Sequence, residues 1–332
     1  MSAERPSEDR LVASFARLAS AGRRRPRGVV AGVGDDCAVV RGDGEDLLLT
    51  TDALVEHRHF EREWFSGHAL GWRAAAVNLS DIAAMGGRPR YALVSLFVPD
   101  GEDLAYVTRI EKGIADHLAR HGAAIVGGNV SGTEGPLAVD VVLVGACARK
   151  AAWMRAARAG DAILVIGELG NAAAGLALLR EGRSAPPRLV RAYLRPAPRL
   201  DVSELLEGER AVRAAIDVSD GLSTDLIRMC RAGRVGCDVE AAKLPLSRAL
   251  EAFCIARGED PVAWALRGGD DYALVLGVAP AAAPAVRARV ERRLGVSAVV
   301  VGRFTASAGT YRLLGEDGGH TPIQPTGWDH LR

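Results

Sequence analysis

Residues 70–89 read LGWRAAAVNLSDIAAMGGRP, a long apolar pattern that ends in a helix stop. Alanine, leucine, valine, isoleucine and methionine dominate it, and the GGRP sequence at 86–89 is typical of a helix end. The pattern therefore predicts a buried helix over about 66–85. We expect the rest of the chain to be organised around this helix.

Three polar residues, Asn78, Ser80 and Asp81, interrupt this apolar pattern. Asn78 and Asp81 are three positions apart and so share a face of the helix. A buried carboxylate needs a cation, because burying an uncompensated charge is costly. Arg73, two turns earlier, is one candidate partner for Asp81 and a bound metal ion is the other. The stretch alone leaves both open.

The composition predicts a well-packed protein without a strong charge field. The chain has 332 residues and is 48% hydrophobic, enough for two domains. Aromatic residues make up 5%, and 42 Lys and Arg balance 41 Asp and Glu, so neither nucleic acid nor an anionic membrane is an expected partner. We find no apolar run of about 20 residues that predicts a membrane span.

Cysteine usage and the N-terminal sequence favour a cytoplasmic location. The five cysteines show no CxxC or zinc-like spacing, as expected of reduced, partly buried thiols. The opening sequence MSAERPSEDRLVASFARLA mixes charges and lacks the apolar core of a signal peptide.

Apolar periodicity divides the chain into two parts. Residues 149–160 are Ala/Arg-rich and irregular, so we expect one domain over 1–148 and another over 149–332. The first is predicted to be strand-rich and the second an α/β layer domain. Further helices are predicted over 7–19, 102–120, 172–180, after Ser219 and over 281–294, and strands over 46–52, 91–98, 137–148, 161–166, 212–218 and 298–301. Residues 266–278 are predicted to be a Gly turn followed by a strand.

Local signals assign several polar segments. His57 and His59 are expected to alternate on one side of an extended segment. AAIVGGNVSGTEGP (123–136) is predicted to be a strand entering a loop whose N–H groups could meet an anion. GELGN (167–171) is predicted to be a plain strand-to-helix turn, although it could cradle a phosphate, and the Pro/Arg-rich segment 182–198 is predicted to lie on the surface. Ser219 is the expected cap of a helix whose N-terminus could face a phosphate.

Acidic residues recur at loop tips after apolar segments: Asp35/Asp36, Asp52, Asp81, Asp217/Asp220 and Asp270/Asp271. Two unit charges about 4 Å apart repel by about 4 kcal/mol at an effective dielectric of about 20, so converging carboxylates require cations. Thr50, Thr51 and Ser219 add hydroxyl oxygens, and no His/Cys set has zinc spacing. These hard oxygen donors favour Mg²⁺ together with substrate phosphates, which indicates phosphoryl chemistry.

The common nucleotide-binding motifs are absent from the sequence. There is no GxxxxGK[ST] loop, and GVGDDC breaks the GxGxxG pattern. We also find no Ser-His-Asp, Cys-His or lysine nucleophile arrangement. Phosphoryl transfer is therefore expected to be direct, with metals and positioned charges carrying the catalysis.

Several segments, in chain order, resemble the thiamine-monophosphate kinase family: GVGDDCAVV, TTDALVEHRHF, GWRAAAVNLSDIAAMGGRP, VGGNVSGTEGPL, LRPAPR, AAIDVSDGLSTDL, GGDDYAL and GWDH. The resemblance implies a two-domain aminoimidazole-ribonucleotide synthetase-like fold of the α+β / α/β class. A strand-rich N-terminal domain would bind ATP and metal and form a homodimer, and an α/β C-terminal domain would complete the active site. The implied reaction is ATP-dependent phosphorylation of thiamine phosphate to thiamine diphosphate with several Mg²⁺ ions.

The resemblance also implies site residues, matched motif by motif. The metal ligands would be Asp36, Thr50, Thr51, Asp52, Asp81, Asn129, Asp217 and Asp220, with Asp81, Asp217 and Asp220 as the catalytic residues. ATP would contact Gly128, Asn129, Arg155 and Ser219, although the spacing from Arg155 to the following AGD is one residue shorter than in the family. Thiamine phosphate would contact His59, Asp270 and Trp328.

Two departures from the family pattern keep alternatives open. The family's GGD is here GGN, so Asn129 keeps a carbonyl ligand but removes a charge, and GGEDY is here GGDDY, so Asp270 is one methylene shorter. The alternatives are another ATP-dependent synthetase of the superfamily, or a catalytically weakened paralogue that binds nucleotide or thiamine phosphate. The hydrogenase-maturation branch would need a C-terminal cysteine, and this chain ends WDHLR. The selenophosphate branch would need a cysteine or selenocysteine with a nearby lysine early in the chain, and residues 1–30 contain neither cysteine nor lysine.

Overall fold

The computed structural model describes residues 8–20, 28–182 and 187–327. These residues form two compact units. The first unit extends to Ile82 and resumes over Gly87–Ala152, and the second comprises Ala83–Gly86 and the chain from Trp153 to Gly327. Among the described helices, none has the length and apolarity needed to cross a membrane.

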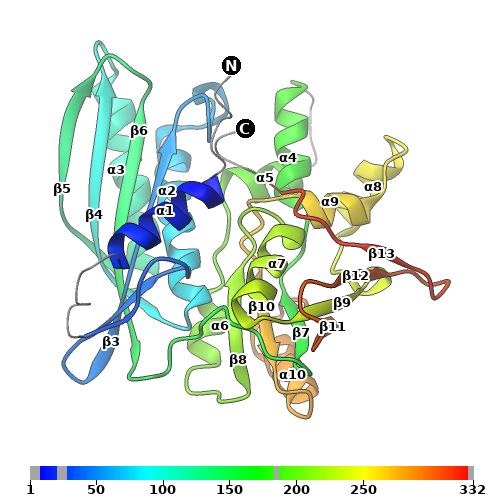
Figure 1. Cartoon of the computed structure of the whole chain (residues 1–332). Helices are drawn as coiled ribbons and strands as arrows, with labels where there is room; N and C mark the ends of the chain where they lie inside the picture. The colour runs from blue at the N-terminus through cyan, green and yellow to red at the C-terminus, as the bar shows by residue number, and fades with distance from the viewer. Residues whose placement is uncertain (1–7, 21–27, 183–186, 328–332) are drawn as a thin grey trace, which may run out of the picture. The chain divides into compact units, whose positions relative to one another are not determined.

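The first unit is built on a six-stranded sheet with the strand order β1-β2-β3-β6-β4-β5 (Figure 1). The β4–β5 pair is parallel and the other pairs are antiparallel. The elements are α1 Glu8–Ser20, β1 Val29–Ala31, β2 Ala38–Arg41, β3 Glu45–Val55, the 3-10 helix η1 Arg62–Trp64, α2 Gly67–Ala84, β4 Arg88–Pro99, α3 Leu104–Arg120, β5 Ala124–Thr133 and β6 Ala138–Ala148.

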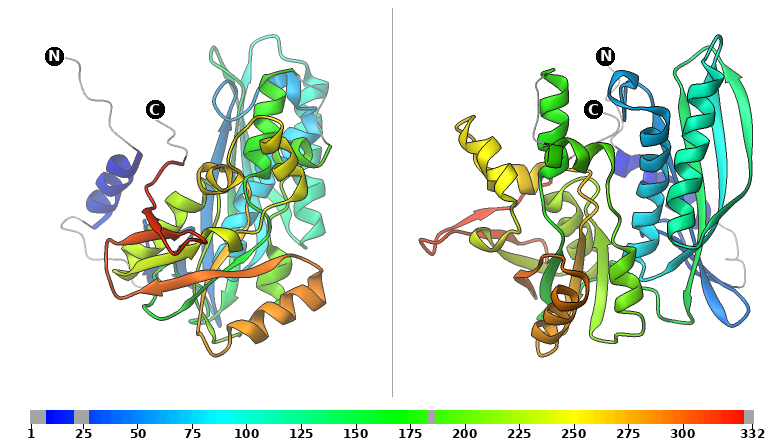
Figure 2. Two further views of the ribbon diagram at one scale, coloured as in Figure 1. Left: turned by 90° about the vertical axis from the view of Figure 1, so that its right-hand side faces the viewer. Right: turned by 180° about the vertical axis from the view of Figure 1, so that it is seen from behind.

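Helices α2 and α3 lie on one face of this sheet (Figure 2). The helix predicted over 66–85 is confirmed as α2, and its face toward the core is fully buried. The backbones of α2 and α3 touch, because a Cβ at Gly71 would lie 1.9 Å from the carbonyl oxygen of Ile110, and one at Gly113 would lie 2.2 Å from that of His68. Glycine at these positions therefore sets the position of α2 in the first unit.

The second unit is a layered domain on a seven-stranded sheet with the order β13-β12-β9-β11-β7-β10-β8. Strands β12 and β9 pair in parallel and the other described pairs are antiparallel. The elements are β7 Ala162–Ile166, α4 Asn171–Arg180, α5 Pro187–Leu194, α6 Leu200–Leu205, β8 Val212–Asp217, α7 Leu222–Gly233, β9 Gly236–Glu240, η2 Ala241–Lys243, α8 Arg248–Ile255, α9 Pro261–Arg267, β10 Leu274–Val278, α10 Ala283–Leu294, β11 Ala298–Thr305, β12 Tyr311–Leu314 and β13 His320–Pro322.

The central strands of the second sheet are buried on both faces. Helix α7 packs with one set of alternating side chains, exemplified by Val165 and Ile216. Helices α6 and α10 pack with the other set, exemplified by Leu164 and Ala215. A third apolar cluster joins α4, α5 and α8. The α/β layer domain expected for the second half is therefore present.

Four local predictions are corrected. Residues 124–133 form one continuous strand, so the glycines at 127 and 128 belong to a sheet and not to a loop. Helix α5 occupies part of the segment 182–198 that was expected to lie on the surface, and it buries Leu189 and Tyr193. Helix α7 is capped by Gly221, which has φ 111°, and not by Ser219. Helices α6, α8 and α9 were not predicted, since they are short and gain their stability from packing.

Candidate active site

In the first unit the fold brings Asp36 and Asp81 together, with carboxylate oxygens within 4.8 Å of each other. Asp81 lies on the last turn of α2, and Asp36 lies between β1 and β2. The hydroxyl of Thr50, in β3, donates a 2.5 Å hydrogen bond to Oδ2 of Asp81. Two carboxylates and a hydroxyl in this arrangement are donors suited to a hard divalent cation.

The alternation of β3 places the neighbouring predicted ligands on two faces of the sheet. Thr50 and Asp52 share the α2 side, whereas Thr51 points to the opposite side. The Thr51 hydroxyl donates a 2.8 Å hydrogen bond to Oδ1 of Asp140, a β6 residue that the sequence did not single out. The two hydroxyls therefore have different partners: Thr50 binds Asp81 on one face of the sheet, and Thr51 binds Asp140 on the other.

Strand β5 carries Gly128 and Asn129 at the edge of the first sheet. Gly128 is required by close packing, since a Cβ there would lie 1.9 Å from the carbonyl oxygen of Val94 in β4. The side-chain nitrogen of Asn129 donates to the Ser131 hydroxyl at 3.0 Å. The carbonyl oxygen is therefore the atom that Asn129 can offer to a cation.

His59 lies in a tight turn and not in the extended segment expected from the sequence. His57 has φ 64°, and its N–H donates to the carbonyl of Phe60 at 2.9 Å, which closes the turn. The backbone N–H of Val55 donates to Nδ1 of His59 at 2.9 Å. Nδ1 is therefore the acceptor, and a neutral His59 carries its proton on Nε2.

A pocket of about 680 Å³ opens in the first unit beside this turn. Glu56, His57 and Arg62 line one part of it, and Glu102 and Gly135 line another. Arg62 pairs with both Glu56 and Glu102. Sequence reasoning missed this group, because Glu102 is remote from Arg62 along the chain.

In the second unit, the end of β8 and the first part of α7 bring together Asp217, Asp220 and Asp225, all of them buried. The backbone N–H groups of Ser219 and Asp220 donate to Oδ2 of Asp225 at 3.1 and 3.0 Å. One nitrogen of Arg228 lies 2.5 Å from Asp220 and 2.9 Å from Asp225. Burial and the neighbouring Asp220 carboxylate raise the pKa of Asp225, and Arg228 partly offsets this effect.

Asp225 therefore occupies part of the anion site that was predicted at the N-terminus of α7. Two of the N–H groups expected to face a phosphate already bind a carboxylate of the same helix. Neither Asp225 nor Arg228 was identified from the sequence, although their spacing of three residues on a predicted helix is the local signal for an ion pair.

The GGDDY segment (268–272), which contacts Ser219, has a strained backbone. Asp270 and Tyr272 have φ angles of 64° and 49°, which are uncommon for residues other than glycine. The N–H of Asp270 donates to the carbonyl of Ser219 at 2.8 Å, and the Tyr272 hydroxyl donates to Oδ1 of Asp270 at 3.0 Å. These contacts fix Asp270 beside Ser219 within the second unit.

Asp271 accepts hydrogen bonds from the N–H groups of Gly170 and Ala172, at 2.6 and 3.2 Å. The start of α4 is thus capped by a carboxylate, which agrees with a plain turn over 167–171. Burial raises the pKa of Asp271 to about 8, although the backbone donors act against the shift.

Arg155 and Trp328 were also predicted to belong to the site. Arg155 lies half-buried in the segment before β7. Trp328 lies outside the described residues. The N–H of Gly327, just before it, donates to the Thr224 hydroxyl at 3.1 Å and so ties this part of the chain to α7.

Known families match both parts of the chain. The family described as AIR synthase related protein, N-terminal domain, matches residues 34–147, and its C-terminal domain family matches residues 158–314. The thiamine-monophosphate kinase of Aquifex aeolicus is 38% identical over 247 residues, 73% of this chain and 79% of that protein. The thiamine-monophosphate kinase of Escherichia coli K12 is 33% identical over 310 residues, 91% of this chain and 92% of that protein.

Solved structures show the same likeness. The structure described as AaThiL complexed with AMPPCP and TMP has a TM-score of 0.85 and 32% identity, covering 99% of this chain and 100% of that one. HypE of Escherichia coli, at 22% identity and a TM-score of 0.72 over 95% of this chain and 96% of that one, shares the fold. The chain therefore belongs to the AIR synthase related family and, within it, to the thiamine-monophosphate kinases.

Proposed function

We propose that this enzyme transfers the γ-phosphate of ATP to thiamine phosphate and so forms thiamine diphosphate. The observation that carries the proposal is the full-length likeness to a kinase structure that holds AMPPCP and TMP. We infer a direct in-line transfer, since the sequence shows no Ser-His-Asp, Cys-His or lysine nucleophile arrangement that would carry the phosphoryl group.

The donors in each unit fit Mg²⁺. Asp36 and Asp81 approach within 4.8 Å, and the hydroxyl of Thr50 orients Asp81. Bound Mg²⁺ would supply charge neutralisation at the phosphate oxygens. We propose that several ions are held by Asp36, Thr50, Asp52, Asp81, Asn129, Asp217 and Asp220. Asp81, Asp217 and Asp220 would be the catalytic members of this set. The hydroxyl of Thr51, also predicted as a ligand, instead binds Asp140 on the other face of the sheet.

The remaining predicted residues would bind the two substrates. His59 would donate its Nε2 proton to the acceptor, as the hydrogen bond at its Nδ1 supports. Asp270 and Trp328 would complete the thiamine phosphate site. Gly128, Asn129, Arg155 and Ser219 would contact ATP.

We further propose that the enzyme works as a homodimer in the cytoplasm. Tyr91, Leu93 and Phe97 of β4 are 53%, 45% and 41% exposed and share the sheet face opposite α2, which is an apolar surface suited to a second copy. All five cysteines are buried free thiols, as expected in a reducing compartment. Sedimentation of Leu93→Asp against the native protein tests the dimer, because a charge on this face should dissociate it.

Incubation with ATP, Mg²⁺ and thiamine phosphate, followed by phosphorus NMR, tests the reaction. Thiamine diphosphate and ADP in equal amounts are the expected products. The departures at Asn129 and Asp270 favour one competing function, a paralogue that binds but does not transfer. Calorimetric binding of ATP and thiamine phosphate without product would select that function.

A further inference from the structure

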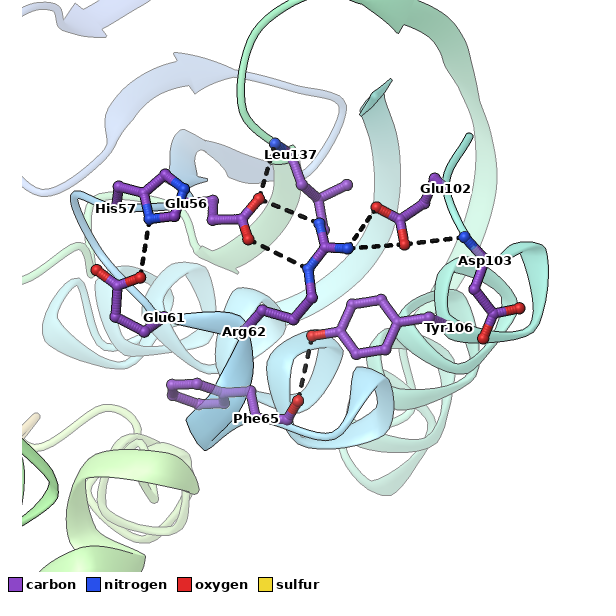
Figure 3. A network of polar contacts seen from close by, with 9 residues as sticks. All are labelled: Glu56, His57, Glu61, Arg62, Phe65, Glu102, Asp103, Tyr106 and Leu137. Atoms are coloured by element: carbon purple, nitrogen blue, oxygen red, sulfur yellow. Dashed lines mark hydrogen bonds and ion pairs between the residues drawn. The ribbon is translucent and has the colours of Figure 1, made fainter. Parts of the chain in front are cut away.

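Arg62 lies at the centre of a polar network in the first unit (Figure 3). Its Nε and Nη2 donate to the two carboxylate oxygens of Glu56, both at 3.1 Å. Its Nη1 lies 2.9 and 2.8 Å from the two oxygens of Glu102. The guanidinium also lies 5.3 Å from the ring centroid of Tyr106, whose hydroxyl donates to the carbonyl of Phe65 at 3.2 Å.

The burial of this network makes Arg62 hard to replace. The side chains of Glu56 and Glu102 are 10% and 4% exposed, and Arg62 bridges them. The backbone N–H groups of Leu137 and Asp103 supply additional donors, at 3.2 and 3.0 Å. Without the guanidinium, two buried carboxylates would keep these neutral donors but lose the cation between them.

The Glu56–Arg62 pair also closes the turn that holds His59. Glu56 is anchored to the sheet, because its N–H donates to the carbonyl of Leu137 at 2.9 Å. Arg62 opens η1 on the other side of His59 and is tied through Glu102 to the start of α3. Both ends of the segment 56–62 are therefore held by one guanidinium, and the His59 ring is oriented between them by the Val55 N–H.

We propose that Arg62 is a positioning residue for the phosphate acceptor. It fixes the segment 56–62 and thereby the direction in which His59 presents its Nε2 proton. This inference rests on the proposed role of His59 in thiamine phosphate binding. The residue acts through His59 and through the fixed turn, and it takes no part in bond making or breaking.

The kinetic test compares Arg62→Met and Arg62→Lys with a matched control, Arg90→Met. Arg90 forms a bidentate pair with Glu45 at the other end of β3, and its side chain is 40% exposed against 39% for Arg62. We expect Arg62→Met to raise the KM for thiamine phosphate about 10-fold or more while the KM for ATP stays within about twofold. Arg62→Lys should recover part of the loss, since one ion pair can re-form, and Arg90→Met should change neither KM.

A second readout needs no substrate. With ¹⁵N-labelled histidine, native His59 should show a single tautomer protonated on Nε2, and Arg62→Met should shift its signals toward tautomer averaging. If Arg62→Met does not fold, Glu102→Gln removes one arm of the network and should give a smaller change of the same kind. Unchanged His59 signals, or equal losses toward both substrates, would overturn the proposal. A native protein that makes no thiamine diphosphate would contradict the proposed function alone, because the NMR comparison still reports on Arg62.

Discussion

The two units hold their acidic side chains in different ways. In the first unit, Asp81 accepts a hydrogen bond from the neutral hydroxyl of Thr50 and lies close to Asp36. In the second unit, Asp220 and Asp225 share the guanidinium of Arg228. A hydroxyl orients a carboxylate and leaves its charge unchanged, whereas an arginine neutralises part of the charge.

This difference separates two roles for a carboxylate in such a site. The arrangement around Asp81 is suited to collecting an external cation. The arrangement around Arg228 supplies a cation from the chain itself, and Asp225 in turn accepts hydrogen bonds from the N–H groups of Ser219 and Asp220. Substitutions around Asp81 should therefore affect mainly the metal-dependent activity. Substitutions around Arg228 should also lower the stability of the second unit.

Asp81→Asn should give the largest effect. Replacing the carboxylate removes a charge beside Asp36 and should lower product formation at least about 10³-fold, with the fold preserved. The measurement is ADP and thiamine diphosphate formation, with circular dichroism to check folding. Asp116→Asn, an exposed carboxylate on α3, is the matched control and should retain activity. Near-native turnover in Asp81→Asn would contradict the metal role.

Arg228→Met should destabilise the second unit by about 3 kcal/mol in the presence of a chelator, because it leaves buried carboxylates without their shared cation. Urea unfolding with chelator and with excess Mg²⁺ measures the effect. Mg²⁺ should restore part of the lost stability if the carboxylates can bind it. A loss of equal size in both conditions would indicate that Asp220 does not exchange Arg228 for a metal.

Gly71→Ala tests how the first unit positions Asp81. The new Cβ would lie 1.9 Å from the carbonyl oxygen of Ile110, so α2 and α3 must move apart, at a cost of about 2 kcal/mol. Thermal unfolding should show the loss, and activity should fall with it. Gly132→Ala is the control, since a Cβ there would meet no described heavy atom within 4 Å. Equal stability of the two variants would contradict the close helix contact.

The pH dependence of Asp271 should give the smallest effect. Its pKa is about 8 in the folded state against an ordinary value of 3.8, so the folded protein holds a proton that the unfolded chain releases. Stability should therefore fall as pH rises from about 4 to about 8, because over this range the unfolded chain has released a proton that the folded protein still holds. Urea unfolding at pH 5 and pH 8 measures the slope. Asp271→Asn should flatten it, and a native slope in that variant would assign the effect to another group.

Local sequence signals predicted the long elements well and the short ones poorly. The 66–85 pattern is confirmed as α2, because an apolar run that ends in glycines specifies a buried helix almost without its neighbours. The glycines of 124–133 suggested a loop, yet the segment is a strand. Gly128 is there because β4 approaches too closely for a Cβ, and that approach depends on residues more than thirty positions away.

In the candidate site, too, local motifs predicted some residues, and contacts between distant residues decided the others. Asp36, Asp81 and Thr50 were named from motifs, and the structure brings their side chains together. The sequence did not identify Asp140, Asp225, Arg228 or the network around Arg62. Each of these residues acts through a contact with another side chain that only the folded chain brings close. Thr51 followed the motif, but strand alternation turned its hydroxyl to the other face, toward Asp140.

The sequence by itself determined which residue types are available: hard oxygen donors after apolar segments, a buried helix carrying Asp81, and an ordered set of family motifs. These are properties of composition and spacing, which need no knowledge of distant contacts. Only the tertiary structure decided which of those oxygens meet, that Arg228 compensates two carboxylates, and that Arg62 joins Glu56 to Glu102. The physical reason is that hydrogen bonds and ion pairs act over a few ångströms, and folding alone brings residues forty positions apart within that range.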